Sequence, residues 1–188
     1  LDADVLNPKE IVQMFKYFGE VSDDNLCFST ATRAEKFIRR FETERYDKGW
    51  TYKSNLKDFI GFSVDQPVKV RGVTLFGSKR GTYKVKFCFK EKSSTTNLFH
   101  KNVSLVSLLM EEEGYYGYDI MFDKPIRLSA NKEYTVEAVI EGPLSWYGKG
   151  GNYTQQCEGV TFTFLKESSP NCTSSSQGQF PRIIFSKT

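Results

Sequence analysis

The chain has 188 residues, of which 39% are hydrophobic and 15% aromatic, and this is enough apolar surface for the core of one domain. Its 26 basic and 23 acidic residues give a formal net charge of +3, which is too balanced for the basic stripe that binds a nucleic-acid backbone. No apolar run approaches the roughly 20 residues of a membrane-spanning helix and the first residues lack a secretion signal, so we expect neither nucleic acid nor membrane as a partner.

Residues 1–35 differ in pattern from the rest of the chain. Asn7 can cap a helix, and Pro8 fits the first helical turn, where its missing N–H does no harm. Large apolar residues then follow at the spacing of one helical face: Ile11, Met14, Phe15 and Phe18. Residues 20–35 are polar and lack periodicity, which is typical of a linker. We predict a short amphipathic helix and linker over residues 1–35, and a β domain over residues 36–188.

The β domain is predicted from alternating apolar and polar residues. Val85, Phe87 and Phe89 alternate with lysine and cysteine, as expected for a strand with one buried face. The predicted strands are residues 36–42, 58–64, 69–76, 82–90, 102–110, 116–122, 134–140, 159–165 and 182–186. Many short strands with short turns and no crossover helices indicate an all-β fold, an antiparallel β-sandwich of jelly-roll type.

The cysteine pattern argues against a metal site. The cysteines are Cys27, Cys88, Cys157 and Cys172. They lie far apart and form no CxxC pair, so the spacing of a zinc site or of a disulfide-rich scaffold is absent. N-x-S/T sequons begin at Asn102, Asn152 and Asn171, but they would matter only in a secreted protein. We therefore expect reduced thiols, no metal and a cytoplasmic location.

Candidate catalytic groups are sparse in this sequence. His100 is the single histidine, and no nucleophile elbow presents a serine or cysteine close to it in the chain. The contiguous acidic residues 111–113 precede Gly114 and are expected to solvate a loop rather than to converge on one atom. The glycine run at 148–151 lacks the spacing and the following helix of a phosphate-binding loop. We predict that the domain is not an enzyme and binds no cofactor.

Aromatic residues beside glycine mark three predicted loops, at residues 49–52, 114–117 and 144–151. Tyr and Trp supply rigid, amphipathic contact area, which binding surfaces use. Trp50 can equally well cap the end of the core, whereas the glycines around Trp146 and Tyr147 favour a role in binding.

Several sequence blocks together suggest a family. In chain order they are Gly49-Trp50-Thr51-Tyr52, Phe59-Ile60-Gly61-Phe62-Ser63-Val64-Asp65, Gly72-Val73-Thr74-Leu75-Phe76-Gly77-Ser78, Gly142-Pro143-Leu144-Ser145-Trp146-Tyr147-Gly148, Cys157-Glu158-Gly159-Val160-Thr161-Phe162 and residues 174–185. This order resembles the PHR domain, the module named for the Pam, Highwire and Rpm ubiquitin ligases. The resemblance runs from about residue 37 to residue 186. Residues 5–15 are similar to the end of a BACK domain, which favours the setting of the BTB-BACK-PHR proteins of the BTBD group.

The resemblance implies a non-catalytic, substrate-binding arm of a cullin-RING-type ubiquitin ligase adaptor. The partners implied are a target protein for ubiquitination and, through an upstream BTB domain, a cullin scaffold. The predicted target-binding residues are Trp146, Tyr147, Gly148, Lys149, Ser176, Gln177 and Gln179. The acidic and aromatic residues 111–116 and the segment 154–156 depart from the family pattern, and they leave the identity of the target open.

Two other functions fit parts of the sequence. A carbohydrate-binding β-sandwich is the alternative, since exposed aromatic residues stack on sugar rings and the sequons and cysteines would suit a secreted protein. An esterase or a glycosidase would have to use His100 or a pair of carboxylates.

Overall fold

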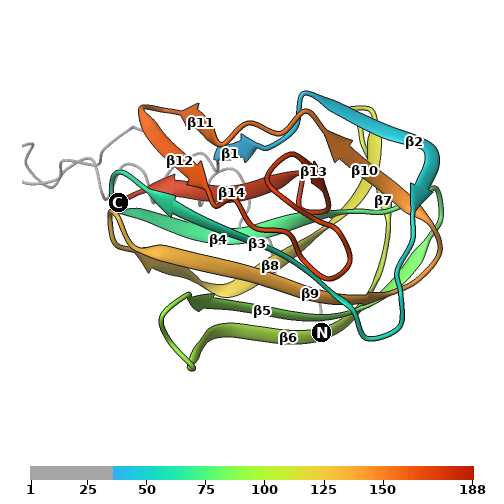
Figure 1. Cartoon of the computed structure of the whole chain (residues 1–188), viewed down its shortest axis with the longest axis horizontal. Helices are drawn as coiled ribbons and strands as arrows, with labels where there is room; N and C mark the ends of the chain where they lie inside the picture. The colour runs from blue at the N-terminus through green and yellow to red at the C-terminus, as the bar shows by residue number, and fades with distance from the viewer. Residues whose placement is uncertain (1–35) are drawn as a thin grey trace, which may run out of the picture. The chain divides into compact units, whose positions relative to one another are not determined.

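The structure of the protein is a computed structural model, and it describes residues 36–188 (Figure 1). Over these residues the chain forms β-strands, turns and irregular loops. The strands pair antiparallel into sheets of six, five and three strands. The predicted all-β, sandwich-like class is thus confirmed, whereas the helix expected within residues 1–35 lies outside the described residues.

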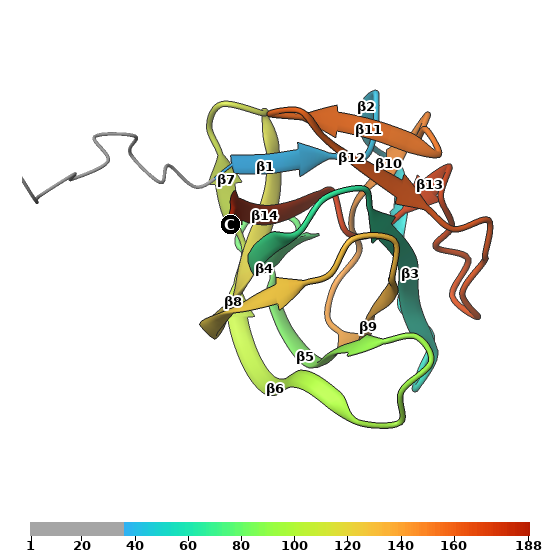
Figure 2. The same ribbon diagram turned by 90° about the vertical axis from the view of Figure 1, so that its left-hand side faces the viewer.

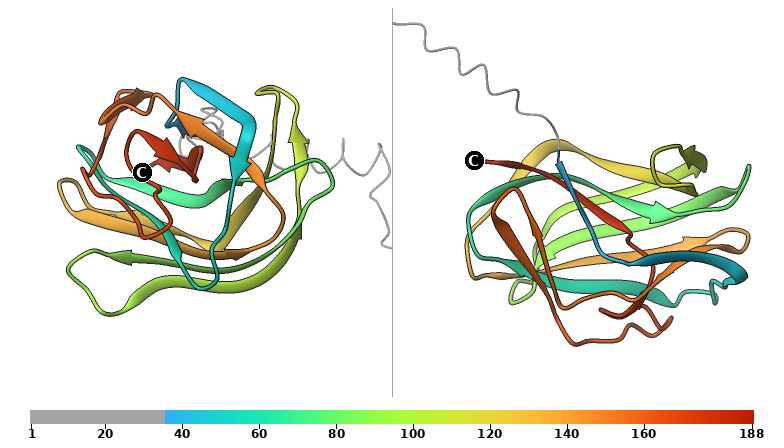
Figure 3. Two further views of the ribbon diagram at one scale, coloured as in Figure 1. Left: turned by 45° about the vertical axis from the view of Figure 1, so that its right-hand side comes forward. Right: turned by 90° about the horizontal axis from the view of Figure 1, so that it is seen from above.

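The largest sheet forms one side of the sandwich. Its strands, in spatial order, are β11 (Thr154–Cys157), β12 (Val160–Phe164), β3 (Lys57–Val64), β9 (Glu133–Glu141), β5 (Thr82–Glu91) and β6 (Asn97–Val106). In β5 the buried residues Tyr83, Val85 and Phe87 alternate with exposed residues, which is the pattern of a strand with one face on the core. The green β5–β6 hairpin lies at one side of the domain (Figure 3).

The five-stranded sheet faces it, with β4 and β14 opposite β3 and β9 (Figure 2). Its order is β1 (Lys36–Arg39), β14 (Arg182–Lys187), β4 (Val68–Phe76), β8 (Tyr115–Leu128) and β7 (Leu108–Met110). The core between the two sheets is strongly aromatic. Phe62 is fully buried, and its ring centroid lies 5.9 to 6.3 Å from those of four neighbours: Phe89, Tyr134, Phe162 and Phe164. Burial of each such side chain stabilises the fold by roughly 1.5–3 kcal/mol.

A small third sheet contains β13 (Gln177–Gly178), β10 (Ser145–Lys149) and β2 (Thr43–Trp50). It borders a second apolar cluster of Phe41, Phe76 and Tyr115, against which Trp146 packs. Successive side chains of a strand point to opposite faces, and Leu75 of β4 belongs to the main core. Phe76 therefore lies on the other face of the five-stranded sheet, and the second cluster is separate from the main core.

The predicted strands all coincide with strands of the structure, but four strands were missed. Residues 49–52, 114–117 and 144–151 were predicted as loops, and this was partly wrong because β2 ends at Trp50, β8 begins at Tyr115 and β10 spans Ser145–Lys149. The other missed strands are β11 and β13. The predicted strand 102–110 is in fact divided at Ser107, whose N–H donates to the carbonyl of Gly81 at 2.8 Å where the chain passes from one large sheet to the other.

Candidate binding surface

The residues predicted to bind a partner come together on two neighbouring strands. Lys149 of β10 is the register partner of Gln177 of β13, and Trp146 and Tyr147 precede it on β10. Ser176 comes immediately before β13, and its carbonyl accepts a 3.0 Å hydrogen bond from the N–H of Gly151. Two segments that lie far apart in sequence therefore form one region of the third sheet.

The predicted residues differ in their exposure. Lys149 and Ser176 are exposed, and Trp146 and Gln177 are half-buried. In contrast, Tyr147 is buried, and so are Gly148 and Gln179. Side chains that reach solvent can contact a partner directly, whereas the buried ones can act only by positioning them.

Gln179 joins the third sheet to the five-stranded sheet. Its Oε1 accepts a hydrogen bond of 3.2 Å from the N–H of Phe76, and its Nε2 donates to the Oγ of Ser145 at 3.1 Å and to the carbonyl of Trp146 at 3.2 Å. Its side chain is fully buried. Gln179 therefore supports β10 from inside the fold and does not present its side chain to solvent.

Gly148 has a packing role that the sequence did not suggest. A Cβ atom at this position would overlap the ring of Phe41, a residue of the second apolar cluster. Only glycine lets the backbone of β10 approach this ring so closely. The glycine therefore reflects close packing rather than a flexible loop.

Tyr147 fixes the adjoining strand β2. Its hydroxyl donates a 2.8 Å hydrogen bond to Asp47 Oδ1, and its ring centroid lies 5.7 Å from that of Trp50. This hydrogen bond is the main cause that lowers the pKa of Asp47 and raises the pKa of Tyr147. The charges of Lys149 and Arg45 lower the pKa of Asp47 further, so Asp47 is a stable carboxylate in a cationic setting.

Tyr46 is a surface residue that the sequence analysis missed. Its ring stacks on that of Trp146, with centroids 5.8 Å apart and planes 29° apart, and Tyr46 is 47% exposed. Its only signal in the sequence is an aromatic residue within a run of charged ones, Glu44 to Lys48. The pair gives the surface two adjoining aromatic rings.

The loop that carries Ser176 and Gln177 is anchored by two buried ionisable residues. Asp58 of β3 accepts hydrogen bonds from Thr173 Oγ1 at 2.6 Å and from Asn171 Nδ2 at 2.9 Å. Burial raises the pKa of Asp58 to about 6, although these hydrogen bonds oppose the shift.

Arg40 anchors the same loop from the segment between β1 and β2. Its guanidinium donates to the carbonyls of Gln179 at 2.8 Å, Ser174 at 2.7 Å and Phe180 at 3.2 Å. It also lies 4.6 Å above the ring of Phe41. Burial lowers the pKa of Arg40 to about 9, and the three carbonyls accept hydrogen bonds from its two terminal nitrogens in place of water.

The histidine that the sequence offered for catalysis lies on β6, the outermost strand on one side of the six-stranded sheet. His100 of β6 is exposed and is the register partner of Cys88 on β5. Burial and then the charge of Glu137 raise the pKa of the Cys88 thiol, and a catalytic nucleophile needs the opposite shift. Within residues 36–188, no cluster of three or more His, Cys, Asp or Glu residues is arranged to hold a metal ion.

The acidic run 111–113 behaves differently from the expectation. Glu111 and Glu112 are exposed, as predicted. However, Glu113 Oε1 lies 3.3 Å from Arg39 and 3.2 Å from Arg182, and its side chain is 4% exposed. Glu113 therefore ties this turn to β1 and β14 instead of solvating a loop.

Comparison with known proteins identifies the family. The model of the PHR domain matches residues 39–186. The chain belongs to the PHR domain family. The resemblance seen in the sequence blocks is thereby confirmed, and the third sheet and its loops are parts of a PHR domain.

The relatives of this PHR domain are BTB/POZ domain-containing proteins. It is 28% identical over 191 residues to BTB/POZ domain-containing protein 6-B of Danio rerio, covering 97% of the chain and 38% of the relative. The human BTB/POZ domain-containing proteins 6 and 3 are 28% and 27% identical over 97% and 96% of the chain, covering 34% and 35% of those proteins. The chain thus spans between about a third and two-fifths of the length of these relatives. No helix within residues 36–188 is of a length and hydropathy to cross a membrane.

Proposed function

We propose that this PHR domain is the substrate-binding arm of a cullin-RING-type ubiquitin ligase adaptor. The observation that carries the proposal is the partly exposed, stacked pair of Tyr46 on β2 and Trp146 on β10, the strand that also carries the exposed Lys149. In this proposal an upstream BTB domain, of the kind named in the relatives, binds the cullin scaffold. The PHR domain binds the target protein in the cytoplasm, and recruited machinery transfers the ubiquitin.

The chemistry of the surface supports protein recognition. Trp and Tyr are enriched among the residues that contribute most to binding between proteins, because their large rings lose little conformational entropy. Lys149 and Gln177 add hydrogen-bonding groups at the rim, directly opposite each other on paired strands. Tyr147 and Gln179 hold this surface in place from beneath.

The surroundings of His100, the single histidine of the sequence, do not support a catalytic role. His100 lies on an exposed sheet face, and its register partner Cys88 has a raised pKa. We therefore propose that the domain acts by binding.

The carbohydrate-binding alternative loses two of its supports. The Asn171 sequon cannot carry a glycan in the folded domain, because Asn171 is buried and its Nδ2 donates to Asp58. The cysteines of the described region, Cys88, Cys157 and Cys172, are free thiols. A secreted setting is therefore less well supported than the sequons suggested.

The proposal is tested in the longer protein that contains this domain. Proximity labelling in cells would compare wild type with the double variant Trp146→Ala/Lys149→Glu, and Lys84→Glu/Lys86→Glu on the exposed face of β5 serves as the control. We expect the test variant to lose a set of labelled, ubiquitinated proteins while still precipitating a cullin. The thermal midpoint of the isolated domain should stay within about 5 °C of wild type, which excludes unfolding as the cause.

Two outcomes would contradict the proposal. One is a full-length wild-type protein that precipitates no cullin. The other is an unchanged set of ubiquitinated neighbours in the test variant, which would assign target binding to another surface.

A further inference from the structure

Strand β2 carries an unusually large bulge beside Trp146. Arg45 is the register partner of Tyr147, and Trp50 is the register partner of Ser145. Residues 46–49 of β2 therefore stand opposite the single residue Trp146 of β10. Bulges redirect side chains and often occur at functional edges of sheets.

The bulge is held in a fixed arrangement. Asp47 accepts the hydroxyl hydrogen bond of Tyr147 at 2.8 Å, and Tyr46 stacks on Trp146. Gly49 supplies the positive φ of 63° at the end of the bulge. The bulge therefore presents its side chains from a supported backbone.

The apolar part of this surface is exposed. Tyr46 is 47% exposed and Leu144 is 46% exposed, while Trp146 is half-buried. A Cβ at Gly49 would touch the side chain of Leu144, so Leu144 borders the bulge. Exposed large apolar side chains that lie together are typical of an interaction site.

Exposed cations lie on the two strands that carry the aromatic pair, β2 and β10. Arg45, Lys48 and Lys149 are exposed, and none of them forms an ion pair within residues 36–188. Asp47 is the carboxylate of the bulge. Tyr147 donates a hydrogen bond to it, the charges of Arg45 and Lys149 also act on it, and Lys149 Nζ lies 5.5 Å from the centroid of the Tyr147 ring. On the outer face of the six-stranded sheet, Lys57 and Lys90 are both paired with Glu137, whereas Lys84 and Lys86 have no ion-pair partner within residues 36–188.

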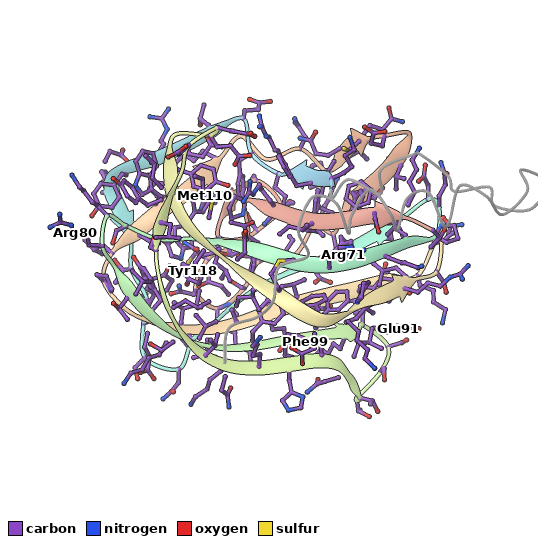
Figure 4. All side chains as sticks on the ribbon, turned by 180° about the vertical axis from the view of Figure 1, so that it is seen from behind. Arg71, Arg80, Glu91, Phe99, Met110 and Tyr118 are labelled. Carbon is purple, nitrogen blue, oxygen red and sulfur yellow. The ribbon has the colours of Figure 1, made fainter. Side chains whose placement is uncertain are left out.

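A neighbouring turn adds further positive charge. The N–H of Trp146 donates to the carbonyl of Gly77 at 2.8 Å, which places the turn after β4 next to β10. Lys79 and Arg80 of this turn are exposed, and Arg80 projects at the end of the domain (Figure 4). Neither of them has an ion-pair partner in the described part of the chain.

We propose that the bulge and its surroundings bind an acidic segment of the target protein that carries one aromatic or large aliphatic side chain. The apolar side chain packs on Tyr46, Trp146 and Leu144, and the carboxylates of the segment meet Arg45, Lys48 and Lys149. Charge complementarity of this kind gives specificity and speeds association. The inference rests on the proposed function, and it adds the chemistry of the target.

The test is a selection of random displayed peptides on the domain, with affinities of the enriched peptides measured by fluorescence anisotropy. We expect enriched peptides to be acidic and to share one aromatic or large aliphatic position. The triple variant Arg45→Glu/Lys48→Glu/Lys149→Glu should lower their affinity by more than about tenfold. Tyr46→Ala, at an exposed position, should lower it several-fold, and the affinity of wild type should fall as salt rises.

The control variant carries the same change in charge elsewhere, Lys84→Glu/Lys86→Glu/Lys124→Glu at exposed positions, and it should bind the peptides as wild type does. Neutral or basic enriched peptides, no enrichment, or equal loss in both triple variants would overturn the inference. Binding of a labelled single-stranded oligonucleotide in place of peptides, with the same sensitivity to the triple variant, would also overturn it. One of these contradicting outcomes can occur while Trp146→Ala/Lys149→Glu still abolishes target ubiquitination. In that case the proposed function stands, and only the inference that the target segment is acidic is wrong.

Discussion

The hydroxyl of Thr173 donates a 2.6 Å hydrogen bond to the carboxylate of Asp58, although 115 residues separate the two in the chain. This contact is the centre of a buried polar network that attaches the loop 168–180 to strand β3. The loop has little regular structure, and it carries Ser176 and Gln177 of the candidate surface. Its conformation therefore depends on groups that lie far away in sequence.

We predict that Asp58 makes the stability of the domain depend on pH. The pKa of Asp58 is about 6 in the fold, above the value of about 3.9 in an unfolded chain, so the native state binds the proton more tightly. The stabilisation is fully present below about pH 4 and is lost as the pH rises through 6. It amounts to about 1 kcal/mol between pH 7 and pH 5.

Urea unfolding of wild type and Asp58→Asn at pH 5, 6 and 7 measures this effect. The unfolding free energy of wild type, relative to that of Asp58→Asn, should fall as the pH rises from 5 to 7. Asp123→Asn, at an exposed site, is the control and should follow wild type. Parallel pH profiles for wild type and Asp58→Asn would show that Asp58 does not titrate in this range.

We predict that Arg40→Met destabilises the domain by roughly 2–4 kcal/mol, because the carbonyls of Ser174, Gln179 and Phe180 lose their donor. Limited proteolysis should also cut the chain faster within residues 174–180. Arg39→Met is the matched control, since the Arg39 side chain is 57% exposed and its ion pair with Glu113 should contribute less than about 1 kcal/mol. Equal effects of the two substitutions would contradict the anchoring role of Arg40.

We predict that Gly148→Ala and Phe41→Leu are not additive. Gly148→Ala alone should cost about 1–3 kcal/mol, because the new methyl group overlaps the Phe41 ring. Phe41→Leu alone should cost about 1–2 kcal/mol through lost packing. The double variant should lose less than the sum, as unfolding free energies would show, since the smaller side chain makes room for the methyl group. Strict additivity would mean that the two residues do not compete for the same space.

We predict that, among the three cysteines of residues 36–188, alkylation at pH 8 modifies Cys172 first. Cys172 is exposed, whereas Cys88 and Cys157 are half-buried. Burial raises the pKa of both half-buried thiols, and the nearby Glu137 and Glu158 raise them further. Peptide mapping by mass spectrometry should show a rate advantage of roughly tenfold for Cys172, which disappears in urea. Faster modification of Cys88 would contradict the assigned environment.

The sequence was sufficient for the strands of the two larger sheets, with the exception of β11. In β5 and β12 the alternation of apolar and polar residues predicts one buried and one more exposed face, as the structure shows. It was not sufficient for β2, whose segment Thr43–Trp50 is polar and does not alternate. Such a strand forms because β10 offers it a partner, and no local pattern reports that partner.

The candidate surface shows the same division. Aromatic residues beside glycine pointed to Trp146 and Tyr147, and the family motif pointed to Ser176 and Gln177. Only the structure shows that Trp146 is half-buried and Tyr147 buried. The pleat of β10 turns these successive side chains in opposite directions. Tyr46 was missed, since its importance comes only from stacking on Trp146 across the sheet.

By itself, the sequence determined the fold class, the family and the region of the chain that carries the candidate surface, because periodicity and motif order are local properties. Tertiary structure alone decided that Gln179, Asp58 and Arg40 are internal supports. It also decided that Gly148 is a point of close packing and that Tyr46 belongs to the surface. Each of these roles depends on partners distant in the chain, and burial by such partners is what turns a polar residue into an anchor.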